Sequence, residues 1–236
     1  MLTIMKEAYH GFLCVNKKKD MSSYDVIRRI KKNIPEKKIG HAGTLDPFAE
    51  GLLIIAIGRA YTKQISQFQQ LNKRYSFCIS LGTATDTQDL TGQIIDTADV
   101  PSLTENNILQ VLDQFKGEQE QMPPQYSAKK VNGTAAYKLA RAGKVADLKP
   151  INVCVEDLIL NKIELVDAKT YLYLDAVVSK GTYIRTLSVD IAQALGTVGH
   201  TCELVRSQIG TYTLDTALDV DDLDGDRIKA GLFRDC

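Results

Sequence analysis

The order of strand-like and helix-like segments constrains the fold of this chain more than any other feature. The segments mix without the steady strand–helix alternation of a parallel α/β sheet. We therefore predict an α+β fold built on a mixed, mostly antiparallel sheet flanked by helices. The expected strands are 12–15, 52–57, 75–81, 153–165, 171–178 and 202–213, and the expected helices are 23–34, 103–116 and 184–196.

Helix ends carry recognisable signals at two places. Ser22 or Ser23 can cap the first helix, and Pro35 ends it, because the residue before a proline avoids helical geometry. In the helix at 103–116, Ser102 and Glu105 have the spacing of a capping box, and Gly117 supplies the stop.

Composition places the chain among ordinary globular proteins. It has 236 residues, of which 44% are hydrophobic and 25% charged. The longest apolar run, 52–57, is too short to cross a bilayer, and the first ten residues lack the apolar core of a secretory signal. We predict a cytoplasmic protein with one domain over 1–236 and no membrane association.

Five cysteines lie far apart in the sequence, and none has the short spacing of a zinc-ligand pair. Their odd number does not fit a complete disulfide framework. We expect reduced, mostly buried thiols and no metal or other cofactor. The cysteines are Cys14, Cys78, Cys154, Cys202 and Cys236.

Charge is unevenly distributed although the net charge is zero. Residues 1–80 hold 14 lysines and arginines against 6 acidic residues, which leaves a balance of −8 for the rest. An anionic polymer lying across the N-terminal part explains this asymmetry, and a solvated, charge-rich helix face explains it equally well. Residues 122–150 form a second basic stretch, a long excursion opened by two prolines, and residues 215–236 form an acidic tail.

The densest chemical signal is the run GHAGTLDPFAEGLL at 40–53. Its three glycines and one proline suggest a shaped loop that holds Asp46 at its apex. Asp-Pro is also common in plain turns, so Asp46 by itself does not indicate catalysis.

Together with further motifs, this run resembles the TruB family of tRNA pseudouridine synthases. The resemblance covers about 11–210, and the motifs follow in the family's order. They are GHAGTLDPFAEGLL at 40–53, KRY at 73–75, LG with TDTQDLTG at 81–92, PPQYSAKKVNG with AYKLAR and glycine at 123–143, GTYIRTL at 181–187 and LVRS at 204–207.

The chain departs from the family pattern at several positions. Lys18 and Asp20 stand where the family's first motif has proline and glycine, and Lys149 stands where an arginine is frequent. Aspartate tolerates a left-handed backbone better than most residues, so we expect the turn at Asp20 to persist. After 210, too few residues remain for the C-terminal PUA domain that many bacterial members carry.

The resemblance implies a pseudouridine synthase fold, an isomerase (intramolecular transferase) activity, and uridine 55 in the tRNA T loop as the target. It assigns Asp46 as the essential carboxylate, Arg185 as its ion-pair partner, and Tyr75 as a residue that stacks on the extruded uracil. His41 and Lys17 would contact the RNA, whereas Tyr183 and Leu204 would line the base pocket.

The implied partner is the T-stem-loop of tRNA, whose target base must be flipped out of its stack. Residues 122–150 would act as a basic, thumb-like RNA-binding insertion that is mobile without RNA. We expect a stand-alone monomer without a protein partner, although a guide-RNA-dependent enzyme stays open. The alternative from another class is a catalytically silent T-arm RNA-binding or tRNA-folding protein. A hydrolase fits less well, because no phosphate loop or second carboxylate can be paired with Asp46 from the sequence.

Overall fold

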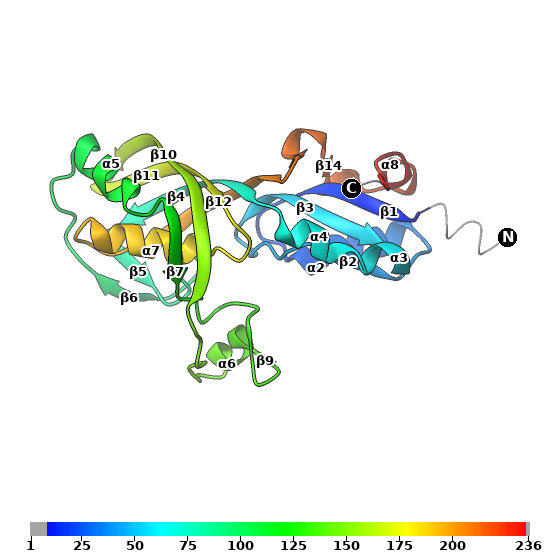
Figure 1. Ribbon diagram of the computed structural model, residues 1–236, viewed down its shortest axis with the longest axis horizontal. Coiled ribbons are helices and arrows are strands. Elements are labelled where there is room, and N and C mark those ends of the chain that lie inside the picture. Colours follow the sequence, from blue (N-terminus) through cyan, green and yellow to red (C-terminus); the bar gives the residue numbers. More distant parts are fainter. Residues whose placement is uncertain (1–8, 235–236) are drawn as a thin grey trace. The chain divides into compact units, whose positions relative to one another are not determined.

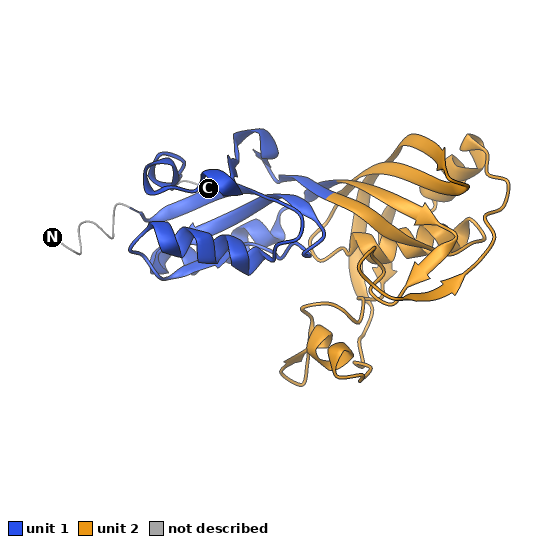
Figure 2. Cartoon of the chain, turned by 180° about the vertical axis from the view of Figure 1, so that it is seen from behind, with its two compact units in different colours: residues 1–75, 205–236 blue, residues 76–204 orange. Residues whose placement is uncertain are grey.

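The computed structural model describes residues 9–234. Residues 235–236 at the end of the acidic tail, including Cys236, and eight of the first ten residues lie outside this range. The chain divides into two compact units, unit 1 with residues 1–75 and 205–236, and unit 2 with residues 76–204 (Figure 2). Strands β4 (Lys73–Leu81) and β12 (Gly199–Ile209) contribute to both units. Whether the chain acts as one catalytic domain stays a prediction.

Unit 1 is built on the strand order β14-β1-β3-β12. The long strands β1 and β3 are antiparallel, with Gly11 opposite Ile57 and Lys17 opposite Gly51. β14 runs parallel to β1, and β12 runs parallel to β3. The strands are β1 (Gly11–Lys17), β2 (Ile39–His41), β3 (Glu50–Ile57), β13 (Tyr212–Thr213) and β14 (Leu218–Asp219), and the α-helices are α2 (Ser23–Asn33), α3 (Arg59–Thr62), α4 (Ile65–Gln70) and α8 (Gly225–Ala230).

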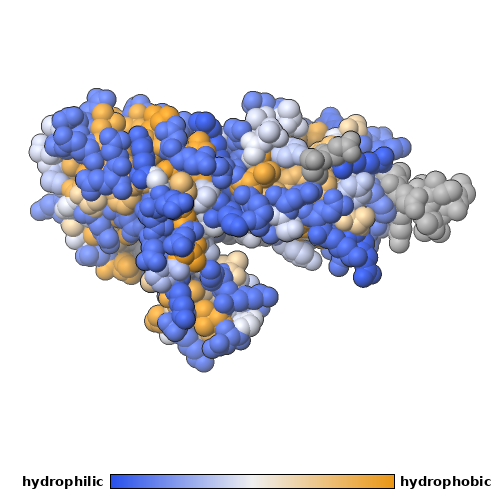
Figure 3. Space-filling model, in the orientation of Figure 1, coloured by the Kyte–Doolittle hydropathy of each residue, from blue (hydrophilic) through white to orange (hydrophobic). Residues whose placement is uncertain are grey.

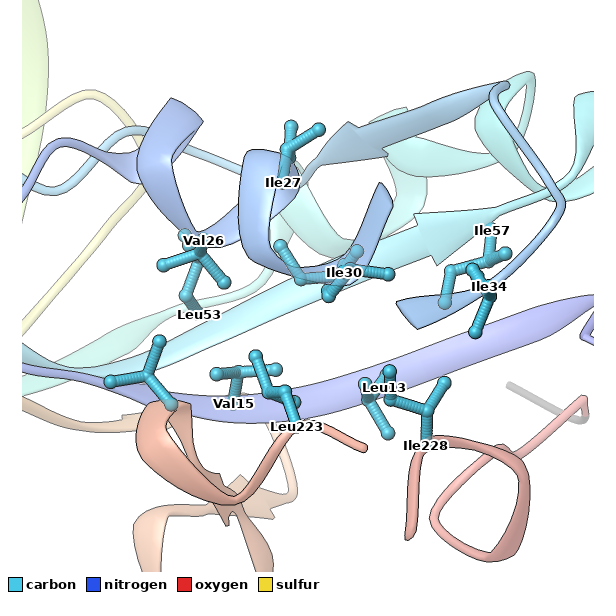
Figure 4. Packing of buried hydrophobic residues seen from close by; sticks show 12 residues of the cluster. Leu13, Val15, Val26, Ile27, Ile30, Ile34, Leu53, Ile57, Leu223 and Ile228 are labelled. Carbon is cyan, nitrogen blue, oxygen red and sulfur yellow. The ribbon is translucent and has the colours of Figure 1, made fainter. Parts of the chain in front are cut away.

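Helix α2 begins and ends where the sequence predicts. Ser22 is the N-cap, with its hydroxyl accepting the Asp25 amide and the Asp25 carboxylate accepting the Ser22 amide. The helix buries Val26, Ile27 and Ile30 against β1 and β3 (Figure 4). This burial forms one of the apolar core clusters of unit 1.

The sheet strands of unit 2 follow the order β12-β4-β11-β10-β7, with β10 antiparallel to both of its neighbours. These strands and their helices confirm the predicted α+β class with a mostly antiparallel sheet (Figure 1). None of the helices within residues 9–234 is long and apolar enough to cross a membrane. The elements are β5 (Thr83–Thr85), β6 (Ile94–Thr97), α5 (Glu105–Asp113), β7 (Gly117–Gln121), β10 (Ile151–Val166), β11 (Lys169–Val178) and α7 (Ile184–Ala194).

The capping box predicted for α5 is wrong. Thr104, rather than Ser102, caps the helix, and its hydroxyl accepts the Asn107 amide at 3.2 Å. The helix is shorter than predicted at both ends, since it runs from Glu105 to Asp113. Ile108 and Leu112 are its buried residues. Several residues here can cap, and the apolar spacing alone does not choose among them.

The excursion at 122–150 folds into a small substructure that projects from the rest of unit 2 (Figure 1). It contains the hairpin β8 (Lys130–Val131) and β9 (Thr134–Ala135), and its helical part is short, α6 (Ala136–Arg141). Ala136, Ala146 and Leu148 form its own small core. Its surface is largely hydrophilic with some apolar residues exposed (Figure 3), and its mobility without RNA stays a prediction.

The acidic tail packs on unit 1. β14 pairs with β1, and Val220, Leu223 and Ile228 are buried in the α2 core (Figure 4). Tail carboxylates also pair with N-terminal cations. Asp219 and Asp221 both pair with Lys18, and Asp221 also pairs with Arg29. Part of the N-terminal positive charge is therefore balanced within unit 1, an outcome that neither reading of the charge asymmetry anticipated.

Replacing a tail core residue should destabilise unit 1. We expect Leu223→Ala, at a site 4% exposed, to lower the free energy of unfolding by about 2–4 kcal/mol, because the change leaves a cavity among packed side chains. Leu165→Ala is the matched control at a site 72% exposed, and its effect should stay within about 0.5 kcal/mol. Urea denaturation of both variants measures the difference. Equal losses would mean that the tail does not contribute to the core.

Candidate active site

The predicted site residues fall in both compact units. Unit 1 contains Lys17, His41, Asp46 and Tyr75, whereas unit 2 contains Tyr183, Arg185 and Leu204. The predicted pairing of Asp46 with Arg185 joins residues of different units and stays a prediction.

Asp46 lies half-buried at the start of a tight turn between β2 and β3. The Asp46 carbonyl accepts the Ala49 amide at 3.1 Å, and Pro47 occupies the second turn position, for which its fixed φ is suited. The apolar side chains on both sides of the turn, Leu45 and Phe48, are buried. The turn therefore holds the Asp46 backbone between two anchored side chains.

Two side chains distant in sequence clamp the flanks of this turn. The Ser23 hydroxyl accepts the Leu45 amide at 2.9 Å and donates to the Leu45 carbonyl at 3.1 Å. The buried Arg206 guanidinium donates to the carbonyls of Gly43 and Leu52. Gly51 lets the main chain of Arg206 on β12 lie close to β3, because a Cβ at Gly51 would lie 2.4 Å from the Arg206 carbonyl oxygen.

Lys17 binds main-chain carbonyls of the same turn through its ammonium. Its side chain is fully buried, and its ammonium donates to the carbonyls of Ala49 at 2.5 Å, Met21 at 2.8 Å, Lys18 at 2.9 Å and Pro47 at 3.4 Å. Burial lowers the pKa of Lys17 to about 8, and the nearby carboxylates of Asp46 and Glu50 oppose this shift. This geometry suits a residue that positions the Asp46 turn rather than one that contacts RNA directly.

The predicted tolerance of Asp20 for a left-handed backbone is confirmed. Asp20 has a φ of 62°, and its amide donates to the Pro47 carbonyl at 2.9 Å. The replacement of the family's glycine by aspartate therefore preserves a turn that also contacts the Asp46 loop.

His41 and Tyr75 are the other predicted residues of unit 1. His41 ends β2 opposite Ile55, and burial together with the Arg206 guanidinium lowers the pKa of its imidazole, against a main-chain hydrogen bond at Gly43. An imidazole with a lowered pKa is neutral at physiological pH and interacts by hydrogen bonding rather than by charge. Tyr75 lies on β4 and is 9% exposed.

In unit 2, main-chain carbonyls and one carboxylate cradle Arg185. Its guanidinium donates to the carbonyls of Thr87 at 2.6 Å and Tyr126 at 2.8 Å, and lies 3.5 Å from the Asp89 carboxylate. The side chains of Arg185 and Asp89 are 4% and 6% exposed. The cradle thus fixes a buried cation in one orientation.

Asp89 is itself held rigidly. Its other carboxylate oxygen accepts the Thr87 hydroxyl at 2.8 Å, the Thr91 amide at 2.9 Å and the Thr91 hydroxyl at 2.6 Å. Gly92 keeps this turn compact, because a Cβ there would lie 2.4 Å from side-chain oxygens of Asp86 and Thr87. The TDTQDLTG motif is therefore a folded support for Arg185.

Tyr183 and Leu204, the two predicted base-pocket residues, both lie in unit 2. The Tyr183 amide donates to the Gln121 side-chain oxygen at 2.8 Å, and the Gln121 amide group donates back to the Tyr183 carbonyl at 3.1 Å. This exchange fixes the start of α7, two residues before Arg185. Leu204 is 5% exposed on β12.

The supporting residues were missed from sequence. Ser23, Asp89 and Arg206 all lie in or beside recognised motifs, yet motif membership does not reveal that their side chains clamp the turns bearing Asp46 and Arg185. Among residues 9–234, no three or more histidine, cysteine, aspartate or glutamate side chains are grouped so that they could hold a metal ion.

The buried Lys17 predicts a specific pH dependence of stability. Its pKa is about 8 in the folded chain against an ordinary 10.5, so the unfolded chain binds more protons between these values. The free energy of unfolding should therefore rise with pH over this interval, by up to about 3 kcal/mol from Lys17 alone. Urea denaturation at several pH values should show this rise in the wild type relative to Lys17→Met. Parallel pH curves for the two proteins would show that Lys17 keeps its ordinary pKa.

Comparison with known proteins places these features in one family. The family model described as "TruB family pseudouridylate synthase (N terminal domain)" matches residues 31–184. The chain is 43% identical over 213 residues to tRNA pseudouridine synthase B of Caldanaerobacter subterraneus, covering 90% of this chain and 73% of that protein. It is also 43% identical to tRNA pseudouridine synthase B of Francisella philomiragia, covering 91% and 70%.

Solved structures agree on the fold. A chain in the crystal structure of a Cbf5-Nop10-Gar1 complex matches with a TM-score of 0.70 and 25% identity, over 94% of this chain and 55% of that one. A chain in an H/ACA RNP bound to a substrate RNA matches with a TM-score of 0.67 and 24% identity, over 93% and 54%. The chain thus spans about half the length of these solved chains. The predicted pseudouridine synthase fold and isomerase class are confirmed, and the chain belongs to the TruB family of pseudouridylate synthases.

Proposed function

We propose that this protein isomerises uridine 55 in the T loop of tRNA to pseudouridine, with Asp46 as the essential carboxylate. The observation that carries the proposal is the clamped turn at Asp46, formed by the family's own motif residues. Relatives that share about 43% identity are named tRNA pseudouridine synthase B.

The reaction breaks the N1–C1′ bond of the nucleotide, rotates the base, and joins C5 to C1′. The C5 proton is released and N1 gains a proton, so no oxidant and no phosphate donor takes part. A carboxylate beside the sugar can stabilise or capture the electron-poor C1′ while the base is detached, as in glycoside chemistry. Asp46 is suited to this role because its turn is held by contacts on both flanks and needs little reorganisation.

The other site residues have distinct roles in the proposal. Arg185 pairs with Asp46 and keeps it ionised, since its cradle presents a fixed guanidinium. Tyr75 stacks on the extruded uracil, and Tyr183 and Leu204 line the base pocket. His41 contacts the RNA beside the flipped nucleotide, whereas Lys17 positions the Asp46 turn.

The insertion at 122–150 supplies much of the RNA affinity. It carries six cations against one acidic residue, and all six are exposed. Contacts from these residues to T-arm phosphates offset the cost of base flipping, roughly a few kcal/mol. The six cations are Lys129, Lys130, Lys138, Arg141, Lys144 and Lys149.

In this proposal the protein acts in the cytoplasm as a monomer on tRNA alone. The solved relatives come from complexes named for further protein or RNA components, so a requirement for added components is the contrasting outcome. A silent T-arm binder is less well supported, because binding alone does not need the Asp46 turn to be fixed by the side chains of Lys17, Ser23 and Arg206.

Asp46→Asn should bind T-arm RNA with near wild-type affinity and lose isomerisation by on the order of 10³-fold or more, because the amide keeps the shape but cannot act as an anion. Tritium release from C5-labelled uridine in a T-arm transcript measures the rate, and filter binding measures affinity. No other protein or RNA is added.

The matched control is Glu50→Gln, which neutralises a half-buried carboxylate four residues away. It should keep close to the wild-type rate. A fully active Asp46→Asn protein would refute the catalytic assignment, and a wild type that binds without releasing tritium would favour the silent RNA binder.

Lys130→Gln and Lys144→Gln should weaken binding and its salt dependence. Each lost phosphate contact should reduce the slope of log affinity against log salt by about 0.7–0.9. Lys162→Gln is the control, since Lys162 is exposed on β10 outside the insertion. Titration of T-arm RNA at several salt concentrations checks this, and slopes equal to those of Lys162→Gln would remove the insertion from the RNA interface.

A further inference from the structure

Two of the free cysteines in unit 2 lie on neighbouring strands. Cys78 is on β4 and Cys202 is on β12, and these strands are adjacent in the sheet. The Cys202 sulfur lies 3.3 Å from the Cys78 carbonyl oxygen, to which its thiol donates. Neither residue belongs to the proposed catalytic set.

The register of the two strands places these cysteines opposite each other. The Gly82 amide, just after β4, donates to the carbonyl of Val198, just before β12, at 2.7 Å. The end of β4 therefore meets the start of β12, which makes the pair antiparallel. Cys78 lies four residues before Gly82, and Cys202 lies four residues after Val198. In an antiparallel pair these equal steps place Cys78 opposite Cys202. Opposed residues in such a hydrogen-bonded pair have Cα atoms about 5.5 Å apart, within the range of a disulfide, and their side chains share one face.

The two thiols differ in environment. Cys202 is half-buried, whereas Cys78 is 1% exposed. A hydrogen bond from the Cys78 thiol lowers the pKa of Cys202 against the effect of burial, and the same contact, with burial, raises the pKa of Cys78. The charged and polar groups nearest the pair are Glu203 on β12 and Tyr173 on β11, which hydrogen-bonds Glu164 on β10. The more accessible thiol, Cys202, thus also has a neighbouring thiol that can donate to its sulfur.

We propose that Cys78 and Cys202 form an oxidation site, at which a hydroperoxide converts the two thiols into a reversible cross-strand disulfide. The Cys202 thiolate attacks one peroxide oxygen, which breaks the O–O bond and leaves a sulfenic acid and hydroxide or alkoxide. The Cys78 sulfur then attacks the Cys202 sulfur, the S–S bond forms, and the sulfenic oxygen leaves as water with the Cys78 proton. Two thiols lose two electrons in total, and the peroxide gains them.

The test treats the full-length reduced protein with hydrogen peroxide, blocks remaining thiols with an alkylating agent under denaturing conditions, and maps tryptic peptides without reduction. Trypsin leaves Cys78 in peptide 75–116 and Cys202 in peptide 186–206, each with one cysteine. We expect these two peptides to be cross-linked and to separate after treatment with dithiothreitol. Cys14, whose burial raises its pKa to about 11, should stay alkylated.

Variants separate the two steps. In Cys78→Ser, Cys202 should stop at a sulfenic acid that dimedone traps, and in Cys202→Ser, Cys78 should stay reduced. Cys154→Ser is the control for the other half-buried thiol and should cross-link like the wild type. The wild-type peptide map decides the question even where a variant fails to fold. Oxidation that leaves peptides 75–116 and 186–206 unlinked, or links either to another cysteine, would overturn the proposal. None of these readouts depends on uridine isomerisation.

Discussion

The ammonium of Lys17 is the interaction on which the geometry of unit 1 depends most. A buried cation without partners is strongly disfavoured, and here main-chain carbonyls from two different turns replace the lost water. Because the carbonyls of Pro47 and Ala49 belong to the Asp46 turn, the burial of Lys17 and the shape of that turn depend on each other. Losing either set of groups would leave the other buried and unsatisfied.

Arg185 in unit 2 is another buried cation that donates to main-chain carbonyls. Its cation is also satisfied chiefly by carbonyl oxygens, from Thr87 and Tyr126, but a carboxylate fixes its plane as well. The Asp89 carboxylate balances the charge of Arg185, and the two carbonyls fix the direction of its donors. The cradle therefore supplies an oriented guanidinium, and the proposed pairing with Asp46 would add a second carboxylate to it.

The sequence predicted the elements and the loop but not the contacts that hold the loop. Strand alternation, helix caps and turn residues are local properties, so β10, β11 and α2 were correctly placed and Asp20 adopted its left-handed turn. The capping box predicted for α5 was wrong because neighbouring residues can also cap the helix, and Thr104 does so. The buried ends of Lys17 and Arg206 depend on residues more than thirty and more than one hundred and fifty positions away. No local pattern encodes such partners, and motif membership identifies the residues without their bonds.

The charge distribution shows why counting residues along a chain misplaces an RNA surface. The N-terminal excess of cations invited a phosphate-binding reading, yet Lys18 and Arg29 pair with tail carboxylates and Arg28 pairs with Asp25. An RNA phosphate reaching these cations would have to displace a carboxylate of the same charge, so its net gain would be small. The insertion at 122–150 has a single acidic residue among six exposed cations. Counterion release on phosphate binding is therefore larger there than on α2, and the insertion, not the N-terminal helix, should dominate the electrostatic part of RNA affinity.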